Sequence, residues 1–176
     1  EAEESGSDES CLSAFDTDRI WDAVFDPVDV PDGFGVLKQW LYDTGCASDI
    51  VSEALGKEMG HFAFKVPKAP FSTANGKVYC NQRVALSLRG VMDQTCYPNL
   101  LPNAPAALSA GRRSVNGGYA MLWLPHRAPV LISPEGRVMA MWTHAYTPFL
   151  DRDYIEECER DPERLWNTHG VRMHKG

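Results

Sequence analysis

The chain has 176 residues, of which 44% are hydrophobic and 23% are charged, and its formal net charge is -7. These values are typical of one globular domain, and the acidic balance without a Lys/Arg cluster argues against a nucleic-acid-binding surface. No apolar run approaches the roughly 20 residues of a membrane-spanning helix, so we expect no membrane partner. The five cysteines are odd in number and scattered, which favours a reducing, cytoplasmic setting over a disulfide framework.

Composition divides the chain into four regions. Residues 1–10 are acidic and lack large apolar side chains, which predicts a disordered lead-in. Residues 11–35 combine apolar anchors with the turn-rich sequence DPVDVPDGFG, which predicts an N-terminal arm with one short helix. Residues 36–150 have the pattern of short strands separated by turns, so the expected fold is mostly β. Residues 151–176 are a C-terminal extension that is either a packed helix or a flexible connector.

The first elements expected after residue 35 are a strand, a helix and a hairpin. VLKQWLY (36–42) predicts a strand that ends at Asp-Thr-Gly. SDIVSEALGKEM (48–59) predicts a short helix with Ser48 or Asp49 as its N-cap. FSTANGKVYC (71–80) places Asn75-Gly76 between strand-forming flanks, which indicates a tight hairpin turn.

Four further strands and a helix are expected in the rest of the chain. In VYCNQRVALSLRG (78–90), apolar residues such as Val84 alternate with polar ones such as Arg83, which is typical of a half-buried strand. The remaining strands are GYAMLWL (118–124), APVLIS (128–133) and RVMAMWT (137–143), the last two joined by the turn SPEGR. Asp161-Pro162 predicts the start of a helix in the C-terminal extension.

The most informative motif is DTGCAS, residues 43–48. An apolar strand leads into the aspartate, and the glycine permits a sharp turn that exposes the carboxylate. The motif resembles the D-[ST]-G-[AS] signature of retropepsin-like aspartic proteases, with Cys46 where the family most often has alanine. FSTANGKV (71–78) resembles the flap of the copia-type retrotransposon members. LPNAPAALSAGRRSVNGGYAMLW (101–123) and APVLISPEGRVMAM (128–141) resemble their later segments.

The resemblance covers about residues 36–150 and implies a retropepsin-like closed β-barrel with a flap hairpin and short helices. It implies an aspartic endopeptidase that processes a retrotransposon polyprotein without a metal or other cofactor. Because the chain contains a single Asp-Ser/Thr-Gly, the second catalytic aspartate would come from another copy. The expected partners are therefore a second chain, forming a homodimer, and an extended peptide or polyprotein substrate.

The resemblance also assigns roles to individual residues. The catalytic loop would be Asp43, Thr44 and Gly45, with Thr44 holding the two loops together across the dimer axis. Substrate would contact three groups of residues: Cys46, Ala47 and Ser48 after the loop, Ala74, Asn75 and Gly76 in the flap, and Ala110 and Gly111. Ala110-Gly111-Arg112 would pack beneath the active-site loop, and VALSLRG (84–90) would line the substrate groove.

Several other interpretations of these residues remain open. The domain could be a catalytically silent retropepsin-fold module for dimerisation or peptide binding, since fold does not guarantee activity. Asp43 could serve only to form an Asx-type turn. A Cys46-His hydrolase and a zinc site from Cys158, His169 and His174 both lack a motif with suitable spacing. The tryptophans at 21, 40, 123 and 142 are expected in the core rather than at a ligand site.

Overall fold

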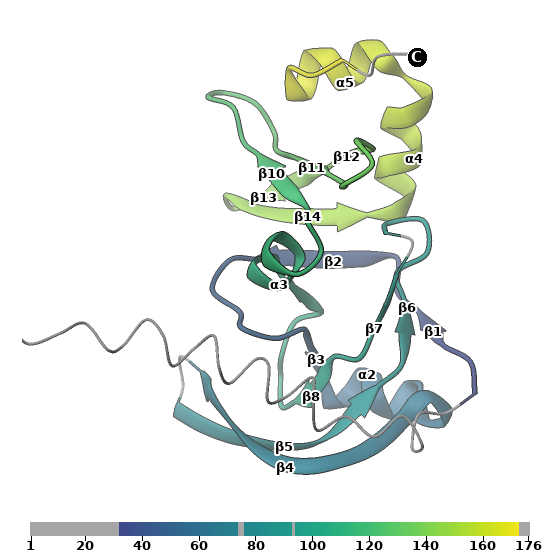
Figure 1. Cartoon of the computed structure of the whole chain (residues 1–176), viewed down its shortest axis with the longest axis vertical. Helices are drawn as coiled ribbons and strands as arrows, with labels where there is room; N and C mark the ends of the chain where they lie inside the picture. Colours follow the sequence, from purple (N-terminus) through teal and green to yellow (C-terminus); the bar gives the residue numbers. More distant parts are fainter. Residues whose placement is uncertain (1–31, 74–75, 93, 173–176) are drawn as a thin grey trace, which may run out of the picture.

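The computed structural model describes residues 32–73, 76–92 and 94–172, and strands dominate this part of the chain. The prediction of a mostly β fold is confirmed. The predictions made for residues 1–31, which include the lead-in, most of the arm and Trp21, lie outside the described residues. The largest sheet has eight strands (Figure 1). Their spatial order is β13 (Trp142–His144), β14 (Thr147–Asp151), β2 (Gln39–Asp43), β9 (Ala107–Ser109), β3 (Ile50–Ser52), β8 (Asn99–Leu101), β5 (Gly76–Val84) and β4 (Ala63–Thr73).

The eight-stranded sheet does not close into a barrel within the described residues. Its edge strands are β13 and β4, and they do not pair with each other. The expectation of a closed barrel is therefore wrong for this part of the chain. β4 is suited to an edge, because Pro67 and Pro70 have no backbone N–H to donate. A central strand needs such donors on both sides, whereas an edge strand pairs on one side only. A register shift between Lys65 and Ala69 further interrupts its pairing with β5.

Two smaller sheets complete the β structure. One has the order β1 (Gly35–Val36), β6 (Leu86–Ser87) and β7 (Thr95–Cys96). The other is an antiparallel meander of β10 (Ala120–Leu122), β11 (Val130–Ile132) and β12 (Val138–Ala140). The meander confirms the strands predicted over 118–124 and 128–133, whereas the strand predicted over 137–143 is divided at Met141 between β12 and β13, which belong to different sheets. Its second turn has Gly136 at φ +86°, and the Gly136 N–H donates to the Ser133 carbonyl at 2.9 Å.

The segment 78–90 differs from the single alternating strand that its pattern predicts. It is divided at Ala85 between β5 and β6, which belong to different sheets. Arg83, Val84, Ala85 and Leu86 are all buried, so the alternation ends where the chain passes from one sheet to the next. Arg83, expected on the exposed face, instead donates from Nε to Asn99 Oδ1 at 3.0 Å.

The helix after the DTGCAS motif begins later than its sequence predicts. Residues 50–52 form β3, and α2 spans Glu53–Glu58 with Ser52 as its N-cap; Ser52 Oγ accepts from the Leu55 N–H at 3.1 Å. Ser48 and Asp49 are therefore not the cap. The β-branched pair Ile50-Val51 favours a strand, and Val51 is completely buried between the neighbouring strands. A short 3₁₀ turn, Gly60–Phe62, follows α2.

The C-terminal extension contains packed helices, which decides between its two interpretations. α4 spans Arg152–Arg160 and α5 spans Pro162–His169. Asp161 caps α5 as predicted, because its Oδ1 accepts from the Arg164 N–H at 3.1 Å and a proline follows it. Ile155, Cys158 and Leu165 are each at most 1% exposed. None of the helices in the described ranges combines the length and apolar character needed to cross a membrane.

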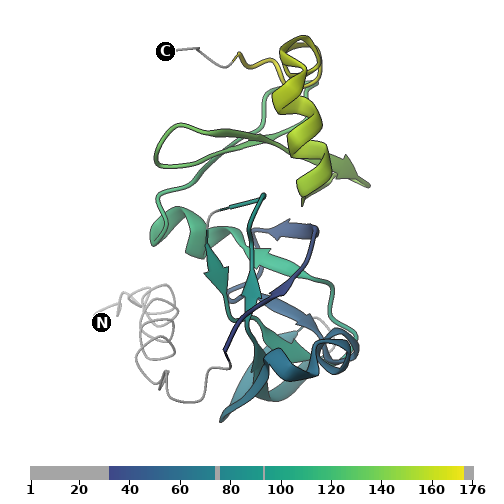
Figure 2. The same cartoon turned by 90° about the vertical axis from the view of Figure 1, so that its right-hand side faces the viewer.

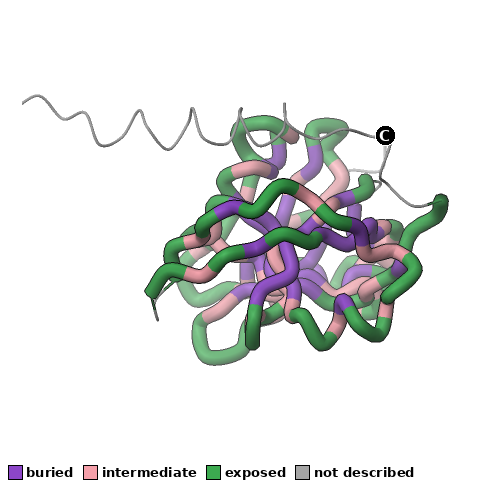
Figure 3. Tube along the Cα trace, turned by 90° about the horizontal axis from the view of Figure 1, so that it is seen from below, coloured by how far each residue is buried: buried purple, intermediate pink, exposed green. Residues whose placement is uncertain are grey.

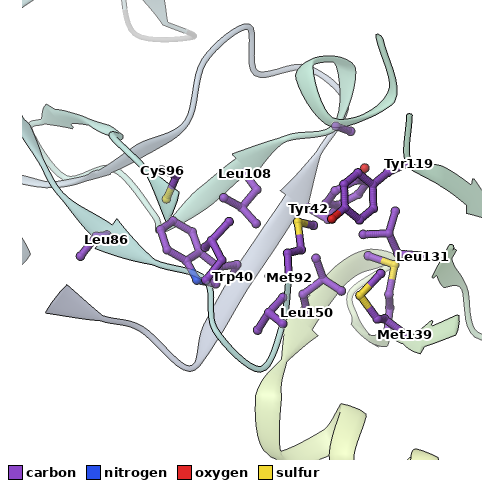
Figure 4. Close-up of a cluster of buried hydrophobic side chains, with 14 of the residues drawn as sticks. Trp40, Tyr42, Leu86, Met92, Cys96, Leu108, Tyr119, Leu131, Met139 and Leu150 are labelled. Atoms are coloured by element: carbon purple, nitrogen blue, oxygen red, sulfur yellow. The ribbon is translucent and has the colours of Figure 1, made fainter. Parts of the chain in front are cut away.

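The core runs along β2 and its neighbours. Trp40, Tyr42, Leu108 and Leu150 are almost completely buried, and their side chains lie in one cluster (Figure 4). Trp40 is thus a core residue as predicted, whereas Trp123 is 42% exposed and is not.

Two groups of elements form the two ends of the molecule. The β10–β12 meander with α4 and α5 is at one end, and the β4–β5 hairpin is at the other (Figures 1 and 2). Seen from below, the buried positions are inside and the hairpin strands are largely exposed (Figure 3).

Candidate active site

Asp43 is the last residue of β2, at the point where the chain leaves the core for the surface. β2 runs parallel to β9, and Asp43 is in register with Ser109. Tyr42 is 1% exposed, whereas Asp43 is only partly buried and Thr44 and Gly45 are exposed. Asp43 therefore does not incur the full desolvation cost that its position after an apolar strand suggests.

The Asp43 carboxylate is oriented by its own loop. Its Oδ1 accepts a hydrogen bond from the Gly45 N–H at 2.8 Å. This is the Asx-type turn that the sequence left open as one interpretation, and it holds one oxygen in place. No hydrogen bond reaches Oδ2 from the described residues. A Cβ on residue 45 would lie 3.4 Å from Asp43 Oδ1, which is ordinary van der Waals contact.

Cys46 does not have the environment of a nucleophile. Its Sγ donates to the Ser48 carbonyl at 2.7 Å. Burial raises the pKa of the Cys46 thiol, and the negative charges of Asp43 and Asp49 raise it further. Within the described residues no histidine is hydrogen-bonded to Cys46. A thiol in this state is protonated at neutral pH, which argues against the Cys-His alternative.

Asp49 and Arg113 form a buried ion pair that joins the end of the DTGCAS loop to the next element of the site. Arg113 Nη2 donates to Asp49 Oδ2 at 2.8 Å, and the two side chains are 9% and 8% exposed. Asp49 Oδ1 accepts from the backbone N–H of Ser109 at 2.8 Å. Both carboxylate oxygens are thus engaged, and the pair fixes the loop against β9. This pair has no local signal in the sequence, because 64 residues separate its members.

The segment Ala110-Gly111-Arg112 forms the first turn of α3, which spans Ala110–Val115. Ser109 caps it, since its Oγ accepts from the Arg112 N–H at 3.3 Å. The parallel pairing of β2 with β9 brings this turn next to the DTGCAS loop, as Figure 1 also shows. Ala110 is buried, but Gly111 is exposed and no atom lies closer than 4.0 Å to a Cβ placed there. The ionic contact with the loop is made by Arg113.

The predicted flap is the β4–β5 hairpin. Thr73 pairs with Gly76, which is the first residue of β5 and has φ +111°. Ala74 and Asn75 themselves lie outside the described residues. The ends of β4 and β5 that meet at the turn are on the same side of the molecule as the loop after β2 (Figure 1). A Cβ at Gly76 would have nothing within 4 Å, so that end of the hairpin has open space around it.

Two other expected site features differ in the structure. VALSLRG (84–90) does not offer a free edge to a peptide, because β6 lies between β1 and β7 and both of its edges are paired. Of the residues expected to contact substrate, Ala47 is exposed and Cys46 is half-buried, while Ser48 is 8% exposed.

No group of three or more metal-ligating side chains gathers among the described residues. His169 is buried, with Nδ1 facing the carbonyls of Ala128 and Pro129 and Nε2 facing the Tyr154 hydroxyl. Both ring nitrogens are therefore engaged within the protein. His174, the third residue of the zinc hypothesis, lies outside the described part of the chain.

The chain was also compared with known proteins. No family model, curated protein or solved structure matches it. Function is therefore inferred from the residues and geometry of the chain itself.

Proposed function

We propose that this protein is an aspartic endopeptidase of the retropepsin-like kind, active as a homodimer in which two Asp43 carboxylates share one site. The observation that carries the proposal is the state of Asp43. Its Oδ1 is held by the Gly45 N–H, and no described residue bonds its Oδ2. An ionised carboxylate accepts through both oxygens, so Oδ2 is available to a water or a second carboxyl group.

In this proposal the second carboxylate comes from another copy of the chain, because Asp49 does not supply it. Asp49, the next acidic residue after Asp43, is buried, and its two oxygens bond the Ser109 N–H and the Arg113 guanidinium. It cannot share a proton with Asp43. The loop residues Thr44, Gly45 and Ala47 are small and exposed, which suits the close approach of an identical loop across a two-fold axis.

The chemistry follows from the pairing of two carboxyl groups. Two carboxylates about 3 Å apart cannot both ionise readily, so they hold one proton between them. The ionised member accepts a proton from the attacking water, and the protonated member donates a hydrogen bond to the peptide carbonyl. The β4–β5 hairpin would close over an extended peptide, and the family resemblance favours a retrotransposon polyprotein as the substrate.

The direct test is Asp43→Asn in the full chain. Asparagine keeps a carbonyl oxygen that can accept from the Gly45 N–H, so the loop should keep its conformation, and the melting curve should be unchanged. Asparagine cannot share or accept the proton, so cleavage of a peptide library, followed by mass spectrometry, should cease. Cleavage by the variant as fast as by the parent would refute the proposal.

The alternative is a catalytically silent module for dimerisation or peptide binding. The observation that favours it is the bond from the Gly45 N–H to Asp43, because a turn alone would account for an aspartate at this position. A parent chain that binds peptides or dimerises but never cleaves them, at any pH between 4 and 8, would support this alternative. Cleavage abolished by Asp43→Asn would exclude it.

A further inference from the structure

One edge of the β10–β12 meander has no partner strand. Within the described residues β10 pairs with β11 alone, and no backbone hydrogen bond reaches its outer side. The opposite edge strand, β12, lies next to α4 (Figure 1), and Ala140 of β12 shares a buried cluster with Cys158 of α4. The N–H and C=O groups on the outer side of β10 are therefore available to a further strand.

The β10 edge lacks the features that normally keep strand edges from pairing with other chains. Natural proteins protect such edges with lysines, prolines or bulges. β4, an edge of the large sheet, has all three, namely Lys65 and Lys68, Pro67 and Pro70, and a register shift. Residues 114–124, which include β10, contain neither a charged residue nor a proline, and β10 pairs with β11 without a register shift.

Apolar side chains are exposed along the same edge. Leu122, the last residue of β10, is 37% exposed, and Trp123 after it is 42% exposed. Ala120, the first residue of β10, is exposed as well. Because β10 has three residues, a partner strand would gain few backbone hydrogen bonds. Burial of these apolar side chains would therefore supply much of the binding free energy.

We propose that β10 pairs antiparallel with β10 of a second copy of the chain, so that this edge forms part of the homodimer interface. Two identical strands can pair in this way across a two-fold axis, because each presents the same surface to the other. Like charges on opposite strands repel, and residues 114–124 carry none. The inference rests on the homodimer of the proposed function and adds the surface through which the two chains meet.

The test places a charge at Leu122 in the full-length chain. In an antiparallel pair centred on β10, residue 122 of one copy lies opposite or diagonal to residue 122 of the other. Leu122→Glu and Leu122→Lys should each raise the dimer dissociation constant, measured by sedimentation velocity, about tenfold or more. An equimolar mixture of the two variants should dimerise like the parent, because opposite charges then meet. Val36→Glu and Val36→Lys, at a 50% exposed position of β1, are the matched controls and should leave the constant unchanged.

A dissociation constant equal to that of the parent in either Leu122 variant would overturn the proposal. A parent chain that is monomeric at every concentration would also overturn it, as would a mixture of folded variants that does not dimerise. Recovery in the mixture shows in addition that both variants are folded. If they are not, Ala120→Glu and Ala120→Lys repeat the test at a second exposed position of β10.

Cleavage measured on the same samples separates this inference from the proposed function. Loss of cleavage in Leu122→Glu and its return in the mixture would support both. A parent chain that dimerises through β10 but never cleaves peptides would refute the proposed function and leave this inference standing. Leu122→Glu chains that still dimerise and cleave like the parent would refute this inference alone.

Discussion

Breaking the ion pair between Asp49 and Arg113 from one side should strongly destabilise the fold, and Asp49→Asn tests this. The substitution keeps an oxygen for the Ser109 N–H but leaves the Arg113 charge, with a side chain 9% exposed, without its carboxylate. Removing one partner of a buried pair costs about 3–5 kcal/mol. In a protein of this size, each kcal/mol lowers the melting temperature by about 2–4 °C. The expected drop is therefore about 6–20 °C.

The assay is urea unfolding followed by circular dichroism, with thermal melting alongside it. Asp153→Asn is the matched control, because it breaks the exposed Lys38–Asp153 pair and should barely change the unfolding curve. Adding Arg113→Met to Asp49→Asn removes the uncompensated charge and should recover much of the loss. A loss below about 1 kcal/mol for Asp49→Asn, the value typical of surface pairs, would refute this account of the site.

Three further predictions concern other positions. Gly76→Val should impair peptide cleavage far more than it lowers the melting temperature. The reason is that φ +111° strains a valine backbone, while the space around the side chain is open. Comparable losses of cleavage activity and of thermal stability would mean that the hairpin has a purely structural role. Gly56→Ala should destabilise the fold by about 1–3 kcal/mol in urea unfolding, because its Cβ would lie 2.5 Å from Leu100 Cδ1, and an unchanged midpoint would contradict this. Burial lowers the pKa of His169 below the ordinary 6.5, so as the pH falls the His169 imidazole is protonated in the unfolded chain before it is protonated in the folded one. The free energy of unfolding should therefore fall as the pH drops below 6.5, and His169→Gln should flatten that dependence. An identical pH dependence in the variant would refute this prediction.

Local sequence signals predicted the elements whose causes are local. The apolar residues of VLKQWLY predicted β2, and Asp161-Pro162 predicted the start of α5. The strands of the meander followed from their β-branched and apolar runs between turn residues. In each case the residues that determine the element lie within a few positions of one another, so a short stretch of sequence is enough to predict it.

The errors arose where a distant partner decides the structure. Aspartate is a residue type that often caps helices, but the Asp49 side chain is bonded to Arg113 and Ser109, which are 64 and 60 residues away. Ser52 caps the helix instead. Arg83 fits an exposed strand position by alternation, yet Asn99 from β8 gives it a buried partner. Tertiary contacts of this kind override local propensity.

The candidate site itself was predictable only in part. The exposed loop at Asp43 followed from the Asp-Thr-Gly turn, because glycine and small residues favour a sharp change of direction. The hairpin was predicted from Asn75-Gly76, but its register depends on how the whole of β4 pairs with β5. The pairing of β6 with β1 and β7, which removes 84–90 as a peptide-binding edge, has no signal in that segment.

The central claim is that one active site needs Asp43 from two chains, and a mixing experiment tests it most directly. Parent chain held at a fixed concentration is mixed with increasing amounts of the Asp43→Asn chain, and peptide cleavage is measured after subunit exchange. If the site is shared, heterodimers carry one carboxylate and activity should fall in proportion to the fraction of parent chains paired with the variant. Activity that stays constant across a tenfold excess of variant, while sedimentation shows that mixed dimers have formed, would contradict the shared site.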